Sequence, residues 1–413
     1  MAKIVQKFGG TSVADIDHVR HAAQVVVNAA NQGDEVLTVV SAMGKTTDQL
    51  IALAEKISPM PAVRELDMLL ATGEQQSVAL MTMAIQQLGG QARSFTGAQA
   101  GIITESKHGC AKIEEVRPSE LQACMNRGEI PVLAGFQGVT ANQELTTLGR
   151  GGSDTTAVAL ANAIGADRCD IYTDVDGVYT GDPHFVNQAS KLATISYEEM
   201  FEMASTGAKV MNDRAVSLAR EGQLPVRVRS TFKPHDQGTL ITGEQDVPDY
   251  SVCGVTLDAN QIWFSWQMVV NNEQEKKLDS IASLFLRLNE LNINADMIML
   301  LAREDEPMQE LVFTVDKSAR SKVQSIIQSS QVSGESKISI DDRLARISVI
   351  SRRLNHHPEI VASVFDALNH VDIPVQMVAT SDMRFSLLIP KAHAEKAVQT
   401  IHGHCNPGFY GRE

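Results

Sequence analysis

Residues 3–12 read KIVQKFGGTS and combine a strand pattern with a loop that can hold phosphate. The run KIVQKF predicts a short strand, and Gly9-Gly10 and two hydroxyl residues follow it directly. Glycines let a backbone approach an anion, their N–H groups can point at it, and Lys7 adds a positive charge. A Gly-Gly pair is as often a simple turn, so this segment alone leaves both interpretations open.

Strand patterns alternate with helical patterns up to about residue 243. Strands are predicted at residues 3–8, 35–40, 130–136, 169–173 and 224–228, and helices at about 15–31, 66–88, 155–163 and 197–220. This alternation predicts an α/β fold with a mostly parallel central sheet covered by helices. Ligand-binding loops then belong at the carboxyl ends of the strands, where the glycine-rich and hydroxyl-rich segments stand.

Composition limits the classes of function. A chain of 413 residues predicts two or three domains. Its net charge of -14 argues against a nucleic acid or an anionic membrane as partner, so a site for anionic ligands must gather positive charge locally. Lys3 and Lys7 interrupt any leader-like apolar run, and the five cysteines form no C-x-x-C pair. We therefore expect a cytoplasmic protein with reduced thiols.

The pattern changes after a polar, turn-rich segment at residues 244–250, which we interpret as a linker between a domain at 1–243 and a region at 251–413. That region repeats the order strand, helix, strand, strand, helix, which predicts two ferredoxin-like modules at about 262–335 and 336–413. The strand near residues 251–258 could be shared with the second module. A single α+β domain without repetition is the alternative.

A second glycine-rich loop, Gly149–Asp154 in the string GRGGSD, opens a predicted helix. Ser153 or Asp154 can cap that helix. A cap needs neither Arg150 nor three glycines, whereas the arginine fork can grip a carboxylate that the glycines allow to come close. We therefore favour a binding function for this loop.

Three further segments have both a functional and a structural interpretation. Gly44-Lys45-Thr46 is not a P-loop, because Val39 stands where that motif needs a glycine, but the loop 41–48 can hold an anion at a helix N-terminus. Residues 173–183 offer carboxylates and hydroxyls to a nucleotide or its magnesium, or form a turn at the Asp-Pro pair. Glu74, in a helical pattern beside Gly73, can receive an ammonium group, although a solvated helix residue is the commoner case.

Together these segments resemble the aspartate kinases of the amino-acid kinase superfamily. The matching strings follow the family's order: KFGGTSV (7–13), VVSAMGKTTD (39–48), LLATGEQQS (69–77), AGFQG (134–138), TTLGRGGSDTTA (146–157), YTDVDGVYTGDP (172–183), GAKV (207–210) and RVRSTF (227–232). The C-terminal repeats are similar to the tandem ACT modules of this family. The resemblance implies an amino-acid kinase fold followed by two βαββαβ ACT modules, and a homodimer formed through those modules.

The resemblance also implies a reaction. The γ-phosphoryl group of ATP, carried with Mg²⁺, would pass to the side-chain carboxylate of L-aspartate to give 4-phospho-L-aspartate, the first step of lysine, threonine and methionine biosynthesis. A carboxylate with an unperturbed pKa near 3.9 is already ionised at neutral pH and needs no general base. Catalysis then reduces to positioning two anions and neutralising the charge between them.

Site residues follow from the resemblance residue by residue. Lys7 and Lys209 would act on the phosphates and Asp154 would organise the reacting groups; Arg150 would bind the α-carboxylate of aspartate and Glu74 its ammonium. The rest of the aspartate pocket would be Ser41, Thr47, Phe136 and Ser153, and the ATP site Lys7, Gly9, Gly10, Thr173, Asp174, Tyr179 and Lys209, with no protein side chain assigned to the metal. An amino-acid effector, lysine or threonine, would contact Asn292, Asn294, Asp296 and Met297.

The sequence departs from the family pattern at several places. His184 stands where an arginine is common, and Asn212-Asp213 follows GAKV. Asp279 and Glu359 align with the glycines of the two turns that meet an effector, so we predict weak or absent feedback by lysine or threonine. Two alternatives remain for the function: another amino-acid kinase, of the glutamate kinase type, and a non-catalytic amino-acid-binding regulator.

Overall fold

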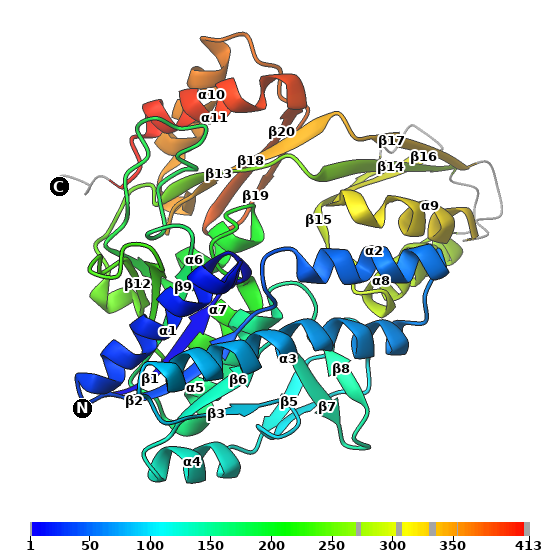
Figure 1. Cartoon of the computed structure of the whole chain (residues 1–413). Helices are drawn as coiled ribbons and strands as arrows, with labels where there is room; N and C mark the ends of the chain where they lie inside the picture. Colours follow the sequence, from blue (N-terminus) through cyan, green and yellow to red (C-terminus); the bar gives the residue numbers. More distant parts are fainter. Residues whose placement is uncertain (1, 270–273, 303–307, 330–335, 353, 409–413) are drawn as a thin grey trace. The chain divides into compact units, whose positions relative to one another are not determined.

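The computed structural model describes residues 2–269, 274–302, 308–329, 336–352 and 354–408 (Figure 1). The chain divides into two compact units. Unit 1 comprises Met1–Thr180 and Ser190–Asp249, and unit 2 comprises Gly181–Ala189 and Tyr250–Glu413. Each unit has its own sheets, so each can be explained from its own residues.

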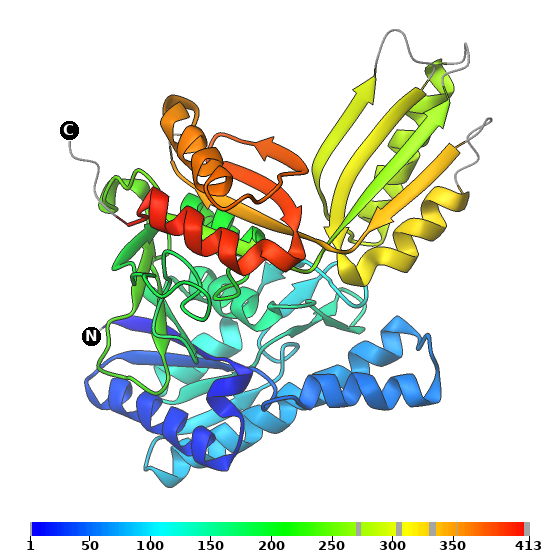
Figure 2. The same cartoon turned by 90° about the horizontal axis from the view of Figure 1, so that it is seen from above.

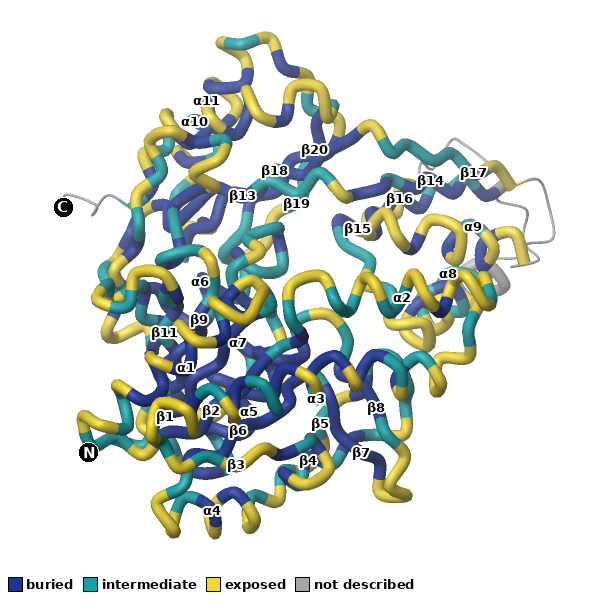
Figure 3. The backbone as a smooth tube through the Cα atoms, viewed as in Figure 1, coloured by how far each residue is buried: buried dark blue, intermediate teal, exposed yellow. Residues whose placement is uncertain are grey.

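The central sheet of unit 1 has eight strands in the order β10-β12-β11-β9-β1-β2-β6-β3. Only β11 and β12 pair antiparallel, which confirms the predicted mostly parallel sheet. The strands are β1 (Lys3–Phe8), β2 (Glu35–Val40), β3 (Ala92–Phe95), β6 (Ile130–Ala134), β9 (Arg168–Thr173), β10 (Thr194–Ser196), β11 (Val226–Ser230) and β12 (Thr239–Thr242). β1, β2, β6 and β9 are almost wholly buried, as the dark tube in Figure 3 shows.

Alternation along β1 explains how both faces of this sheet are covered. Ile4 and Phe8 point into a core that also contains residues of α1 (Ile16–Asn31) and α3 (Val63–Gln87). Lys7 points to the opposite face because side chains alternate along a strand, and there it meets α5 (Gly152–Ile164). The apolar core and the polar site therefore occupy opposite faces of the same strand.

Four further helices complete unit 1: α2 (Thr46–Ile57), α4 (Ser119–Asn126), α6 (Tyr197–Ser205) and α7 (Asp213–Glu221). The sequence predicted one helix over 197–220, and the structure has two. The helical pattern breaks in the turn after α6, where Gly207 adopts a positive φ of 124° that other residues avoid. Asn212 then caps α7 through its side chain.

A second, smaller sheet of unit 1 has the order β5-β4-β7-β8. Its strands are β4 (Ile102–Thr104), β5 (Ile113–Val116), β7 (Gln137–Thr140) and β8 (Leu145–Thr147). None was predicted, because three or four residues are too few to show a period of two. β8 leads directly into the glycine-rich loop that precedes α5.

Unit 2 contains two four-stranded antiparallel sheets, each with two helices (Figure 2). One has the order β15-β16-β14-β17 and the other β13-β18-β20-β19. The strands are β13 (Gly254–Asp258), β14 (Gln261–Val269), β15 (Ala295–Ala302), β16 (Met308–Asp316), β17 (Ser336–Asp341), β18 (Leu344–Ile350), β19 (Met377–Thr380) and β20 (Arg384–Pro390). The helices are α8 (Gln274–Glu290), α9 (Arg320–Ser329), α10 (Pro358–Asn369) and α11 (Ala394–Cys405).

Separate cores favour two modules over a single α+β domain. One core lies between β14, β16 and the helices α8 and α9, and the other between β18, β20 and the helices α10 and α11. Strand pairing corrects the expected boundary at residue 336, because β17 pairs with β14 of the first sheet. β13 pairs with β18, so this strand, at the position of the predicted strand near 251–258, lies in the second sheet.

Asp279 does not occupy the turn that the sequence suggested. It lies inside α8, after the first helical turn, and the residues between β14 and α8 fall outside the described part of the chain. Glu359 does lie in the first turn of α10, at the predicted start of that helix. Of the two aligned positions, only Glu359 therefore supports weakened feedback.

Two further properties are the absence of a membrane-spanning helix from the described part of the chain and the state of the cysteines. Among the described residues, no helix is both apolar enough and long enough to cross a bilayer. None of the five cysteines forms a disulfide, and Cys124, Cys169 and Cys253 are buried.

Candidate active site

The predicted site residues gather where four neighbouring strands of the parallel sheet end. β6, β2, β1 and β9 are adjacent in that order, so their carboxyl ends lie at one edge of the sheet. Gly9 and Gly10 follow β1, Ser41 follows β2, and Thr173 ends β9. The fold thus brings together segments that are more than a hundred residues apart in sequence.

Lys7 and Asp154 form a buried ion pair at the centre of this edge. Lys7 Nζ lies 2.6 Å from Asp154 Oδ1, and the two residues are each 8% exposed. A Cβ on Gly9 would lie 3.3 Å from the same Nζ, so the glycine leaves the ammonium group open on that side. An ammonium group has three donors, so pairing with Asp154 leaves Lys7 with donors for an anionic ligand.

Gly10 lets two loops touch. The N–H of Gly44 donates to the carbonyl of Gly10 at 3.0 Å, which joins the loop after β1 to the loop after β2. A Cβ on Gly10 would meet the carbonyl oxygens of Ala42 and Gly44 at 3.0 and 3.2 Å. Both contacts are to backbone, so only glycine allows this approach.

Asn212 positions two predicted site residues, and the sequence analysis missed this role. Its backbone N–H donates to Asp154 Oδ2 at 3.4 Å, and its side-chain amide donates to the carbonyl of Arg150 at 3.1 Å. Gly151, with a φ of 72°, leaves the space that the Asn212 side chain occupies. The sequence carried only a weak signal, the Asn-Asp pair noted as a departure from the family.

Two cations of the predicted site are exposed and unpaired. Within the described residues, the side chains of Arg150 and Lys209 form no hydrogen bond or ion pair. Arg150 lies in the loop before α5, and Lys209 lies in the turn between α6 and α7, three residues before Asn212. Both are available to an anionic ligand, although no measured contact joins them to Lys7.

Glu74 is buried, which the sequence did not suggest. It lies inside α3, which runs through Gly73 without a break. A Cβ at Gly73 would lie 3.0 Å from the Ala42 side chain, so the glycine allows Ala42 to pack closely against this helix. Glu74 Oε1 accepts from the N–H of Ala42 at 3.0 Å, and its Oε2 is buried without a partner among the described residues. Burial raises the pKa of Glu74 to about 7. A buried carboxylate oxygen without a partner is suited to a cationic ligand group.

Phe136 and three small hydroxyl residues complete the predicted aspartate pocket. Phe136 has a positive φ of 69°, a costly conformation for a bulky residue, and its N–H donates to Thr156 Oγ1 at 3.1 Å. The hydroxyls of Ser41, Thr47 and Ser153 form no hydrogen bond within the described part of the chain, so they are available to a ligand.

The loop after β9 carries the predicted nucleotide residues. Thr173 Oγ1 donates to the exposed Asp174, and the Tyr179 hydroxyl donates to Asp176 Oδ1 at 2.8 Å. Burial and this hydrogen bond raise the pKa of Tyr179 to about 12, so it stays a donor at neutral pH. Lys233, missed by the sequence analysis, pairs with Asp176 Oδ2 at 2.9 Å and lowers the pKa of that carboxyl.

Asp67 is a buried acid on α3 that was not among the predicted site residues. It is 1% exposed on α3 and accepts hydrogen bonds from Thr147 Oγ1 at 2.6 Å, from the N–H of Gly109, and from His108 Nδ1. Thr147 ends β8 just before the loop that carries Arg150. Asp67 therefore anchors the strand from which that loop departs.

The predicted effector residues have varied surroundings in the first module of unit 2. Asn292 and Met297 adopt positive φ values of 51° and 49°, and Asn294 is exposed. Asp296 is ion-paired with Arg346 and, at 3.0 Å, with Arg384. Both arginines belong to strands of the second module, so this carboxylate joins the two modules.

Comparison with known proteins finds one matching family for the first part of the chain and another for the last part. Residues 2–230 match the amino acid kinase family, and residues 347–404 match an ACT domain. The chain is 40% identical to the aspartokinase of Corynebacterium glutamicum over 408 residues, covering 97% of this chain and 96% of that protein. It is 41% identical to aspartokinase 2 of Bacillus subtilis, covering 97% of each.

A solved structure is also similar over almost its full length. Aspartokinase III of E. coli in complex with aspartate and ADP superposes with a TM-score of 0.82 at 27% identity, covering 97% of this chain and 99% of that one. The same enzyme in complex with lysine and aspartate superposes with a TM-score of 0.72.

Proposed function

This chain belongs to the aspartokinases of the amino acid kinase family, and we propose that it transfers the γ-phosphoryl group of ATP to the side-chain carboxylate of L-aspartate, giving 4-phospho-L-aspartate. Its relatives make it a phosphotransferase with an ACT regulatory region. The E. coli relative bound to aspartate and ADP supports the choice of both substrates.

The Lys7–Asp154 pair carries the proposal. A phosphoryl group that passes between two anions needs positive charge at the point of transfer, and Lys7 would supply it. Asp154, whose Oδ1 lies 2.6 Å from Lys7 Nζ, would keep the ammonium group in position during the transfer. The attacking carboxylate is already ionised, so no residue has to remove a proton.

The charges of the side chains suggest which residues would bind each group of aspartate. Arg150, exposed and unpaired in the described structure, would bind the α-carboxylate, and Glu74 Oε2 would bind the ammonium group. Ser41, Thr47 and Ser153 would supply hydroxyl donors, and Phe136 would close the apolar side. With the two charged groups on Cα held, the side-chain carboxylate would be left free to reach Lys7.

The ATP site combines glycines with cations. Gly9 and Gly10 would let the phosphates approach the backbone, with Lys209 as the second cation, and Thr173, Asp174 and Tyr179 would hold the rest of the nucleotide. Mg²⁺ bound to the phosphates would neutralise part of their charge. The exposed carboxylate of Asp174 fits a role toward the waters of such an ion.

The proposal is tested with the purified full-length chain, Mg-ATP and hydroxylamine, which traps an acyl phosphate. Aspartate should give the trapped hydroxamate, and glutamate should give little. Lys7→Ala should abolish turnover, while Lys3→Ala on the same strand should leave it close to that of the unchanged enzyme. No product from aspartate, or a faster reaction with glutamate, would contradict the proposed substrate.

Regulation and assembly form part of the same proposal. β15 is an edge strand of its sheet, and Ile298, Met299, Leu300 and Leu301 on it are exposed. A run of exposed apolar residues on a sheet edge is typical of a surface that pairs with another chain. We therefore place the homodimer contact at β15, and Leu300→Glu should shift the sedimentation coefficient from dimer to monomer.

Feedback by lysine or threonine should be weak. Glu359 lies in the first turn of α10, and His357 Nδ1 pairs with it at 2.6 Å, which lowers the pKa of the carboxyl. An ionised carboxylate at this turn opposes binding of an effector carboxylate. Titrating lysine and threonine into the aspartate kinase assay measures this directly, and strong inhibition by either would contradict it.

A further inference from the structure

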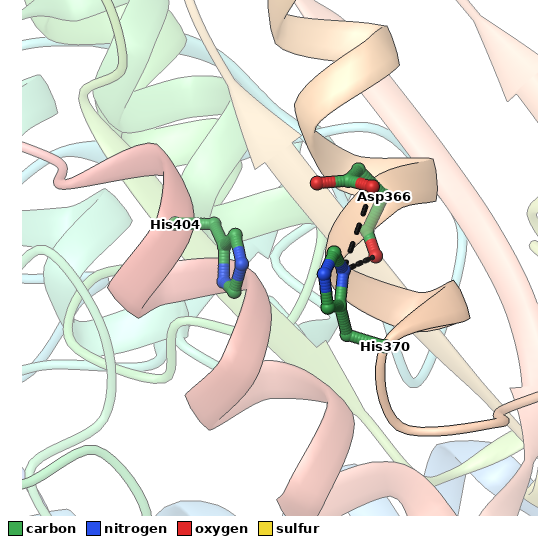
Figure 4. Close-up of side chains that lie close together, drawn as sticks. All are labelled: Asp366, His370 and His404. Atoms are coloured by element: carbon green, nitrogen blue, oxygen red, sulfur yellow. Dashed lines mark hydrogen bonds and ion pairs between the residues drawn. The ribbon is translucent and has the colours of Figure 1, made fainter.

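A cluster of three side chains on unit 2 has no role in phosphoryl transfer. Asp366 and His370 lie one turn apart on α10, and His404 lies in the last turn of α11. One potential ligand atom from each lies within 4.8 Å of the other two, and Figure 4 shows the two histidines beside each other across the two helices. We propose that these residues form a binding site for a divalent transition metal ion of the Zn²⁺ class.

Hydrogen bonds orient both imidazole rings. His370 Nδ1 lies 2.8 Å from the carbonyl of Asp366 and 3.4 Å from Asp366 Oδ1, and His404 Nδ1 lies 3.0 Å from the carbonyl of Thr400. A carbonyl only accepts, so Nδ1 is the donor in both hydrogen bonds, and Nε2 is the ring nitrogen left for a metal ion. Metal-binding histidines are commonly oriented by a hydrogen bond of this kind.

The kinds of ligand atom in the cluster indicate which metal ions it would bind. Two imidazole nitrogens and one carboxylate oxygen suit Zn²⁺, Co²⁺ or Ni²⁺, whereas Mg²⁺ and Ca²⁺ prefer oxygen ligands alone. In a tetrahedral site with bonds of about 2.1 Å the ligand atoms lie about 3.4 Å apart. All three residues are exposed, so small side-chain rotations can close the remaining distance. Water would complete the coordination.

Binding should also stabilise the second module. The site takes two ligands from α10 and one from α11, and the core of this module lies beneath these two helices. An ion that binds only when both helices are in place favours the folded state by mass action. The melting temperature of unit 2, which contains this module, is therefore a readout that does not depend on catalysis.

The test uses the tag-free, full-length protein stripped with a chelator and titrated with ZnCl₂ in excess MgCl₂ by calorimetry. One equivalent of Zn²⁺ should bind, and His370→Ala and His404→Ala should each lower its affinity by at least about tenfold, since loss of a ligand costs no less than loss of its hydrogen-bond partner. Zn²⁺ should raise the melting temperature of the unchanged protein and of neither variant. Aspartate kinase activity should be equal in all three, which separates this inference from the proposed function.

Two further variants serve as controls. His393→Ala removes an exposed histidine at the other end of α11 and should leave Zn²⁺ binding unchanged. Cys405→Ala tests the neighbouring thiol, and binding should persist because Cys405 is not one of the three residues of the cluster. Absence of stoichiometric binding, an affinity in either histidine variant equal to that of the unchanged protein, or loss of binding in Cys405→Ala would overturn the proposal.

Discussion

Glu74 shows how burial gives a single carboxylate a pH-dependent function. The pKa of Glu74 is raised to about 7, so below that pH the free enzyme holds it neutral and loses the charge that would bind the substrate ammonium. We expect kcat/KM for aspartate to rise with pH up to about 7 and then to level off. A pH profile of kcat/KM measures this.

The Glu74→Gln variant should remove the pH dependence. Loss of a charged hydrogen bond to the ammonium group should lower kcat/KM by roughly 10²-fold at pH 8, and the profile should become flat across pH 7. Glu65→Gln, at the exposed start of the same helix, is the matched control and should keep the profile of the unchanged enzyme. A profile with the same midpoint in Glu74→Gln would contradict the assignment.

Glu74 should also destabilise the ligand-free protein as the pH rises. The pKa in the folded state, about 7, exceeds the ordinary value of 4.5, so between these pH values the folded chain holds a proton that the unfolded chain has lost. The free energy of unfolding should therefore fall by about 3 kcal/mol across this window and change no further above it. Comparing melting temperatures of the unchanged protein and Glu74→Gln at pH 5 and pH 8 checks the sign: the variant should gain relative stability at pH 8.

Asp67 should matter for stability and for the loop that carries Arg150. Asp67→Asn keeps the size of the side chain but replaces one acceptor oxygen with a donor that faces the Gly109 and Thr147 donors. The free energy of unfolding should drop by about 2 kcal/mol, and KM for aspartate should rise. Asp48→Asn, at the exposed start of α2, is the control. It should change the free energy of unfolding by no more than about 0.5 kcal/mol and should leave KM for aspartate close to that of the unchanged enzyme.

At the scale of single residues, the sequence predicted which residues belong to the site better than it predicted the burial and contacts of each one. The predicted cluster at the strand ends includes Lys7, Gly9, Gly10 and Asp154, because glycine and charge patterns after strands are local signals. Burial of Glu74 and the role of Asn212 depend on contacts across 32 and 58 residues, which no local pattern contains.

At the scale of elements, the loop after β1 and the loop after β2 are in contact at Gly10. Gly10→Ala would press a Cβ against two backbone carbonyls, at 3.0 and 3.2 Å, and the loops after β1 and β2 would have to separate. Because the phosphate path and the aspartate pocket lie on these loops, turnover should fall by about tenfold or more.

A matched glycine shows whether this loss comes from the contact. Gly403→Ala in α11 meets nothing within 4 Å and should raise the stability of its helix by up to about 1 kcal/mol without changing turnover. Steady-state rates of both variants, with their melting temperatures, distinguish a local effect on the site from general unfolding. Normal turnover in Gly10→Ala would show that the loops tolerate separation.

The strands β1 and β2 and the helices α1 and α3 were predicted close to their observed bounds, whereas α2, α4 and the strands of the small sheet were not predicted. β2 is a nearly continuous apolar run, typical of a buried parallel strand, whereas the three- and four-residue strands of the small sheet are too short to show a pattern. The pairing of β13 with the second sheet agrees with the possibility that the sequence raised for the strand near 251–258. The pairing of β17 with β14 escaped prediction, because strand pairing is a long-range choice that repeats in sequence do not specify.

At the scale of the whole molecule, the two ACT modules are joined by charge as well as by apolar contact. Arg346, on β18, is 2% exposed and pairs with Asp258 and with Asp296 of β15. A small apolar cluster that includes Met297, Leu344 and Leu388 lies beside this pair. The modules should therefore unfold as one cooperative unit.

Asp296→Ala tests this coupling because it leaves a buried arginine with one carboxylate fewer. The free energy of unfolding of unit 2 should fall by about 2 kcal/mol, less than the loss of a fully isolated pair because Asp258 remains beside Arg346. Asp342→Ala removes an exposed pair with Arg320 and should cost at most about 1 kcal/mol. Calorimetry of the full-length variants should show the unit 2 transition lowered and broadened in Asp296→Ala alone. Equal effects in the two variants would mean that the modules are held together by their apolar cluster, with the Asp296 pairs contributing no more than a surface ion pair.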